Sequence, residues 1–170
     1  IVRRELTDVR FIIPCVNEEI LCTVDDYLKK KKGLKVVTYL GNANTALLAC
    51  DVVLTKSGTS TLEASLLKRP MVVAYKIGRL TYHLAYRFMK TEFFALPNII
   101  LNRLVVPEFI QEEASPESLA QALLTELERF SGDPDYLGSF QELHRQLRKN
   151  SNEESAKVFF SFLSKKGSRN

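Results

Sequence analysis

DVVLTKSGTSTLEASLLKRPMVVAY, residues 51–75, is the stretch that most strongly determines the fold. The apolar run at 52–55 predicts a buried strand, a Lys-Ser-Gly turn follows it, residues 60–68 predict a helix, and 71–75 predict another strand. Two strands joined through a helix by short connections indicate a parallel pair with a crossover. Both strands are continuous apolar runs, which predicts a sheet covered on both faces.

The alternation of strands and helices continues outward from this stretch. Strands are expected at 10–14 and 36–40, and helices at 18–31, 44–50 and 81–89. The pattern predicts the α/β class, with a doubly wound, Rossmann-like parallel sheet that is followed by carboxy-terminal helices.

After residue 107 the pattern is helical. A Ser-Pro pair at 115–116 is typical of an N-cap and a first helical position, and it predicts a helix to about residue 130. A Ser-Gly-Asp-Pro sequence ends that helix, and further helices are expected at 138–149 and 153–165.

Composition excludes several classes of protein. The chain has 170 residues, of which 45% are apolar, enough for one folded core and too many for a disordered chain. No uncharged apolar run is long enough to cross a bilayer, and charges interrupt the first apolar stretch, so no signal peptide is expected. Three cysteines without metal-ligand spacing are typical of reduced, buried thiols in a cytoplasmic protein.

The basic residues are unevenly placed, although the net charge is only +4. Residues 64–91 hold six lysines and arginines and no acidic residue, which favours an anionic ligand or surface. We do not expect nucleic acid as a partner, because no recognised binding motif accompanies these charges. His83 and Arg87 lie in this segment, where an ordinary solvated helix face is the simpler interpretation.

The turn at residues 57–61 is where the sequence predicts chemistry. Gly58 lets the backbone approach a ligand closely, and the free amides at the start of the next helix form a site for phosphate oxygens. Four residues add hydroxyl donors without adding bulk: Ser57, Thr59, Ser60 and Thr61. Open α/β sheets bind ligands at this edge, beyond the carboxyl ends of the strands.

Glu63 follows Ser57 by six residues, nearly two turns into the expected helix. A carboxylate at this position could accept hydrogen bonds from ribose hydroxyls while phosphates occupy the amides. The spacing fits equally well a turn that merely caps a helix, with a solvated Glu63, so both interpretations stay open.

The strand-SGT-S-TLE-A-LL-x-x-P-MVVAY pattern resembles the carboxy-terminal half of the lipid-A-disaccharide synthases, which are inverting glycosyltransferases of the two-domain GT-B architecture. Three other blocks are similar to the same family: RFIIPCVNE at 10–18, FALPN at 94–98 and VVPEFIQ at 105–111. The family blocks contain a Leu-Pro-Asn turn and a Val-Pro-Glu helix. The resemblance covers about residues 9–127, and the combined motifs are specific where SGT alone is not.

The resemblance implies a function for the full enzyme. It joins UDP-2,3-diacylglucosamine to 2,3-diacylglucosamine 1-phosphate, and it forms the beta-1,6 lipid A disaccharide 1-phosphate and UDP. Residues 1–130 would form the UDP-sugar-binding domain, and 131–170 a helical extension packed on it or on a missing or partner half. Neither metal nor cofactor is implied, since helix dipoles and side chains offset the diphosphate charge.

The resemblance also assigns roles to individual residues. Residues 57–61 match the diphosphate turn, to which Asn98 is added, and Glu63 matches the ribose-binding acid. The loop that pairs with the uracil edge corresponds to Leu40, Gly41 and Asn42. Two further residues are expected to line the cleft near the donor: Glu108 and Gln111.

The family's amino-terminal half has no counterpart in this sequence. That half would carry the general base and the site for the lipid acceptor, so this chain alone is expected not to catalyse the transfer. The full protein is expected to be cytoplasmic and peripheral to the anionic inner-membrane surface, with a homodimer as a further partner arrangement.

Two alternatives stay open at this point. One is another UDP-N-acetylglucosamine enzyme of the GT-B architecture, either the epimerase or the lipid II-forming transferase, although these use SGG or SGA where this chain has SGT. The other is a non-catalytic nucleotide-binding or interaction domain.

Overall fold

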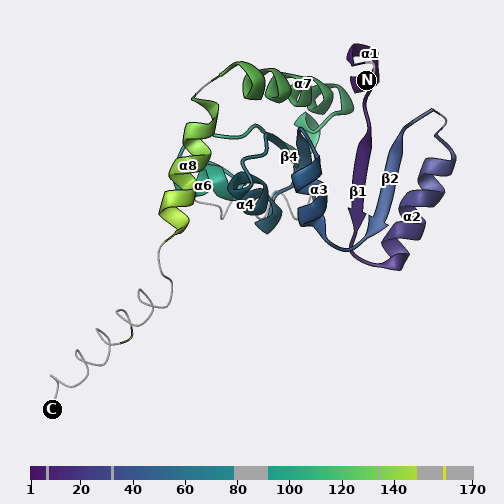
Figure 1. Cartoon of the computed structure of the whole chain (residues 1–170), viewed down its shortest axis with the longest axis horizontal. Helices are drawn as coiled ribbons and strands as arrows, with labels where there is room; N and C mark the ends of the chain where they lie inside the picture. The colour runs from purple at the N-terminus through teal and green to yellow at the C-terminus, as the bar shows by residue number, and fades with distance from the viewer. Residues whose placement is uncertain (7, 32, 79–91, 134, 149–158, 160–170) are drawn as a thin grey trace, which may run out of the picture.

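The computed structural model describes residues 1–6, 8–31, 33–78, 92–133, 135–148 and 159. It contains two parallel sheets flanked by helices, which confirms the α/β class (Figure 1). The helix expected at 81–89, with His83 and Arg87, lies outside the described residues, as does the helix expected at 153–165 apart from residue 159.

Strands and helices alternate along the chain. The first part consists of α1 (Val2–Glu5), β1 (Phe11–Cys15), α2 (Glu18–Lys29), β2 (Val36–Leu40) and α3 (Ala43–Ala49). The second part consists of β3 (Val53–Lys56), α4 (Thr59–Leu66), β4 (Met71–Tyr75), α6 (Leu96–Leu101), β5 (Glu108–Ile110), the 3-10 turn η1 (Gln111–Glu113), α7 (Pro116–Gly132) and α8 (Tyr136–Leu147).

The first sheet pairs β1 with β2 in parallel, and the described residues leave side chains exposed on one of its faces. Ile12 pairs in register with Val37, and these side chains are 36% and 58% exposed. Helix α2 packs against the other face, where Thr38 donates a hydrogen bond to Asp25 of α2 at 2.8 Å. The prediction of a sheet covered on both faces is therefore wrong here, because the helix after β1 shields only one side.

The second sheet has the order β3-β4-β5, again with parallel strands. Its central strand is buried on both faces, since Met71, Val72 and Val73 are at most 1% exposed. The expectation of helix directly after residue 107 is wrong, because residues 108–110 form β5 and Tyr75 pairs with Ile110. The expected Leu-Pro-Asn turn is the first turn of α6.

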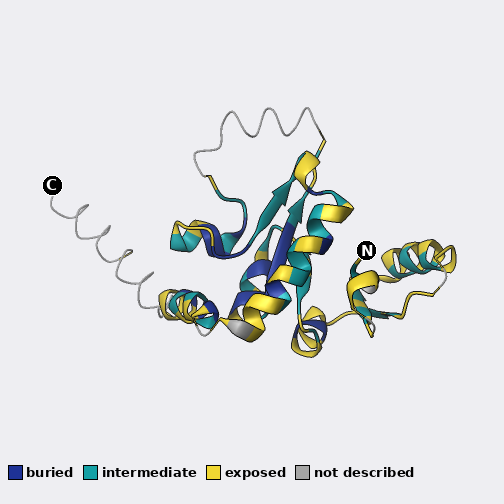
Figure 2. Cartoon of the chain, turned by 90° about the horizontal axis from the view of Figure 1, so that it is seen from above, coloured by how far each residue is buried: buried dark blue, intermediate teal, exposed yellow. Residues whose placement is uncertain are grey.

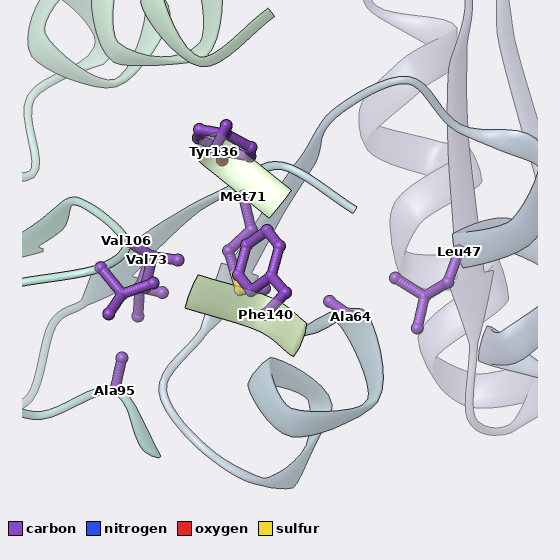
Figure 3. Packing of buried hydrophobic residues seen from close by; sticks show 9 residues of the cluster. Leu47, Ala64, Met71, Val73, Ala95, Val106, Tyr136 and Phe140 are labelled. Atoms are coloured by element: carbon purple, nitrogen blue, oxygen red, sulfur yellow. The ribbon is translucent and has the colours of Figure 1, made fainter. Parts of the chain in front are cut away.

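The core lies between the second sheet and the helices that cover it (Figures 2 and 3). Phe140 of α8 packs in this core with Met71 of β4, Ala64 of α4 and Tyr136. By contrast, α2 has no buried residue, and the part of Figure 2 nearest the amino terminus is largely exposed. Helix α7 runs through residue 130, and the domain division at that position stays a prediction.

A buried carboxylate joins α7 to α8. Glu126 is 2% exposed, and it accepts a hydrogen bond from the Tyr136 hydroxyl and one from Arg129 Nη1 at 2.8 Å. The Arg129 guanidinium also lies 5.0 Å from the centroid of the Tyr136 ring. Burial raises the pKa of Tyr136, because desolvation disfavours the phenolate, and the hydrogen bond to Glu126 raises it further.

We expect Tyr136→Phe to lower the free energy of unfolding near neutral pH by about 1–3 kcal/mol, because buried Glu126 loses a donor. Above about pH 10 an unfolded tyrosine ionises, whereas the pKa of folded Tyr136 is raised. The wild-type chain then loses stability as pH rises, and the difference between the two proteins shrinks. Urea denaturation of both proteins from neutral to alkaline pH measures this difference, and a constant difference would contradict the prediction.

Candidate functional site

The residues at 57–61, here called the Ser57 turn, connect the carboxyl end of β3 to α4. Gly58 is the N-cap of α4 and has φ 151°, a backbone conformation that favours glycine. A Cβ added at Gly58 would meet no heavy atom within 4 Å among the described residues other than its chain neighbours, so these residues leave the space beside this backbone open. The turn therefore presents bare backbone at the start of a helix, where the dipole favours anions.

Three of the four predicted hydroxyls are used inside the protein. Ser57 Oγ donates to the Phe94 carbonyl at 2.5 Å, and Thr61, which is fully buried, donates to the Gly58 carbonyl at 2.7 Å. Ser60 Oγ lies 3.0 Å from the hydroxyl of Thr55. These bonds fix the shape of the turn.

Groups of the described residues that stay available to a ligand include the Thr59 hydroxyl and two amides. Thr59 is exposed and its side chain has no hydrogen bond to the described part of the chain. The first amides of a helix have no intrahelical acceptor. Those of Thr59 and Ser60 have none among the described residues either, whereas the Thr61 amide donates to Gly58 at 3.1 Å.

Two charged residues flank the turn. Glu63 is exposed on α4 and its carboxylate makes no hydrogen bond or ion pair with the residues that the structure describes, which fits both interpretations of its role. Lys56 is the last residue of β3, and its ammonium lies 5.3 Å from the centroid of the Tyr75 ring. Within the described ranges Lys56 has no carboxylate partner. The Lys-Ser-Gly sequence contains Lys56 directly before Ser57, but this pattern did not predict a role for the lysine.

Asn98, predicted to contact the diphosphate, is fully buried and its amide group is fully used. Its Oδ1 accepts from the amides of Val105 and Val106, at 2.7 and 2.9 Å. Its Nδ2 donates to the Val106 carbonyl at 2.8 Å and to Glu108 Oε1 at 2.6 Å. The structure therefore places Asn98 behind the surface, with no polar atom left for a ligand.

The two residues expected to line the cleft also bind the backbone. Both oxygens of Glu108 accept amide hydrogens, Oε2 from Phe94 and Oε1 from Ala95, each at 2.8 Å. The side-chain amide of Gln111 accepts from the Ile77 amide at 2.8 Å and donates to the Ile77 carbonyl at 3.0 Å. Glu108 is thereby connected to the Ser57 turn through Phe94, and Gln111 holds the chain just after β4.

Residues 40–42, predicted to meet uracil, end a strand of the other sheet. Gly41 has φ 94°, and its amide donates to the Cys15 carbonyl at 2.8 Å. The Asn42 side chain caps α3 by accepting from the Asn44 amide at 3.1 Å. No hydrogen bond between described residues joins this loop to the Ser57 turn.

The described residues do not meet the requirements of a metal site, a membrane span or a disulfide. No group of three or more His, Cys, Asp and Glu among them could hold a metal ion, and none of their helices is long and apolar enough to span a membrane. All three cysteines are free; Cys15 is buried as expected and Cys50 is half-buried, but Cys22 is exposed, so the expectation of buried thiols is wrong for Cys22. Burial raises the pKa of the Cys50 thiol.

Comparison with known proteins finds a family model and curated relatives that match most of the chain. A family model described as lipid-A-disaccharide synthetase matches residues 1–159. The chain is 39% identical over 158 residues to a lipid-A-disaccharide synthase of Pseudomonas fluorescens (strain SBW25), covering 93% of the chain and 41% of that relative. It is 43% identical over 149 residues to that of Azotobacter vinelandii (strain DJ / ATCC BAA-1303), covering 87% of the chain and 38% of the relative. The chain thus spans about two fifths of the length of these relatives.

Proposed function

Because this chain belongs to the lipid-A-disaccharide synthetase family, we propose that it forms the donor-binding part of a glycosyltransferase. The donor is UDP-2,3-diacylglucosamine, and the acceptor is 2,3-diacylglucosamine 1-phosphate. The observation that carries the proposal is the Ser57 turn, whose free amides and open backbone lie at the carboxyl end of β3. Ligands of open α/β sheets bind at this end.

In this proposal the donor diphosphate lies on the Ser57 turn. The amides of Thr59 and Ser60 donate to its oxygens, and the Thr59 hydroxyl adds a third donor. The start of α4 and the ammonium of Lys56 offset the negative charge, so the site does not depend on a metal ion. Glu63 accepts from the ribose hydroxyls further along the helix.

The uracil base is proposed to meet the backbone of Leu40, Gly41 and Asn42, since the Asn42 side chain already caps α3. The general base and the acceptor site are proposed to lie in the portion of the relatives that does not align with this chain. A lipid acceptor would bring the full protein to an anionic membrane surface from the cytoplasm, and a homodimer is a further proposal.

We expect Glu63→Ala to weaken binding of UDP by about 1–3 kcal/mol, because a charged hydrogen bond to the ribose is lost. Binding of inorganic pyrophosphate, which has no ribose, should hardly change. Isothermal titration calorimetry with both ligands measures the contrast. Glu128→Ala is the matched control, since Glu128 is also exposed in a helix.

The outcomes separate the role of Glu63 from the function itself. Equal losses for UDP and pyrophosphate would defeat the ribose assignment while leaving a phosphate site. No binding of UDP by the folded wild-type chain would overturn the proposed function.

A further inference from the structure

A chain of hydrogen bonds connects buried Asn98 to the Ser57 turn. Asn98 Nδ2 donates to Glu108 Oε1 at 2.6 Å, and the same oxygen accepts from the Ala95 amide at 2.8 Å. The carbonyl of Phe94 accepts from Ser57 Oγ at 2.5 Å. Three segments that are far apart in sequence, before α4, before α6 and at the start of β5, are therefore linked.

The planar peptide between Phe94 and Ala95 couples the two halves of this hydrogen-bond network. Phe94 C=O and Ala95 N–H belong to one peptide unit, and in a planar trans peptide these two groups point in opposite directions. When Glu108 holds the N–H on one side, the carbonyl is directed to the other side, toward Ser57. Glu108 also accepts from the Phe94 amide through Oε2, so the preceding peptide cannot swing away.

Glu108 is itself held in place by Asn98. The Asn98 side chain is 0% exposed, and four hydrogen bonds to Val105, Val106 and Glu108 fix its orientation. Glu108 makes no ion pair with a described lysine or arginine, so its described partners are the N–H groups of Asn98, Phe94 and Ala95. A residue here must accept on both oxygens, which a carboxylate does and a carboxamide does not.

Phe94, at the end of this hydrogen-bond network that is nearest the turn, acts on the turn in two ways. Ser57 uses its hydroxyl hydrogen on the Phe94 carbonyl, so this hydroxyl anchors the turn and does not donate to a ligand. The Phe94 ring lies 6.3 Å from the Tyr75 ring, over which the Lys56 ammonium is held. The Phe94 segment thus supports both the bare backbone of the turn and the cation beside it.

We propose that Glu108 and Asn98 are positioning residues, which hold the Ser57 turn in the shape that accepts a diphosphate and do not touch the ligand. This inference rests on the proposed function, because the ligand is the UDP moiety of the donor. In this proposal Asn98 does not contact the diphosphate and Glu108 does not line the cleft, unlike the roles that the sequence predicts for them.

A double-mutant cycle with Ser57→Ala and Glu108→Gln tests the proposal. Each single variant should weaken UDP binding about tenfold. The double variant should bind UDP no more weakly than the weaker-binding single variant, because both changes interrupt the same hydrogen-bond network. The unfolding midpoint of each variant shows whether it is folded. Glu63→Ala is the control, because among the described residues the Glu63 carboxylate has no hydrogen bond to this network, and its loss of UDP affinity should multiply with that of Glu108→Gln.

Amide hydrogen exchange provides a readout that requires neither UDP nor the Glu108 variant. Ser57→Ala should speed exchange of the Ala95 amide, because the Phe94–Ala95 peptide loses its restraint on the carbonyl side. Unchanged exchange, or losses of UDP affinity that multiply for Ser57→Ala and Glu108→Gln, would overturn the proposal. Wild-type UDP binding with an unaffected Glu108→Gln variant would overturn it while leaving the proposed function intact, whereas no wild-type binding would overturn both.

Discussion

Gly58→Val should abolish UDP binding while the chain still folds. The valine side chain would occupy the open space beside the turn, and apart from the two neighbouring residues no described residue has a heavy atom within 4 Å of the new Cβ. The change therefore costs folding energy mainly through the backbone strain at φ 151°, about 1–3 kcal/mol. A diphosphate needs the same space, so calorimetry should detect no binding of UDP by the Gly58→Val variant.

Gly58→Ala is the control for strain. Alanine meets a similar backbone penalty with a smaller side chain, so its unfolding free energy should fall much as that of the valine variant does. UDP affinity should nevertheless fall less, because less of the space is filled. A folded Gly58→Val variant with wild-type UDP affinity would show that the diphosphate binds elsewhere.

Phe140→Ala should lower the free energy of unfolding by about 3–5 kcal/mol, the usual cost of removing a buried aromatic ring. Phe140 is 1% exposed and packs edge-to-face on Tyr136, with ring centroids 5.5 Å apart. It also lies in the core with Met71 of the central strand. The loss is a large share of a typical stability of about 5–15 kcal/mol.

Phe130→Ala is the matched control for this measurement. Phe130 also packs edge-to-face on Tyr136, with centroids 6.0 Å apart, but it is 36% exposed. Urea denaturation should show a clearly smaller loss for Phe130→Ala than for Phe140→Ala. Equal losses would contradict the central place of Phe140 in the core.

The strands that are long apolar runs could be predicted from the sequence. Residues 36–40 and 71–75 form β2 and β4 with the predicted bounds, because short runs rich in apolar and β-branched residues favour strands. The three-residue strand β5 could not be predicted from the sequence, because its first residue, Glu108, is held by amides that lie 13 and 14 positions away. Tertiary contacts of this kind leave no periodicity in the local sequence.

The candidate site shows the same division. The role of Gly58 in the turn could be predicted from the sequence, because a close backbone approach requires a glycine. Its φ of 151° confirms that it adopts a conformation that favours glycine. The full burial of Asn98 could not be predicted from the sequence, since an asparagine after proline is compatible with a surface turn. The ring beneath Lys56 belongs to the next strand, and adjacency of strand ends appears only in the folded sheet.

The parallel pairing of every described strand has a consequence for how the site arises during folding. Each parallel pair must wait for its crossover connection, and the Ser57–Phe94 bond closes a separation of 37 residues. Contacts of such high sequence separation form slowly, after local helices. Helix α4 is therefore expected to exist before the turn in front of it is anchored. A chain whose synthesis has not yet reached β5 holds every residue of the turn but lacks Glu108, whose carboxylate holds the Phe94–Ala95 peptide that anchors Ser57.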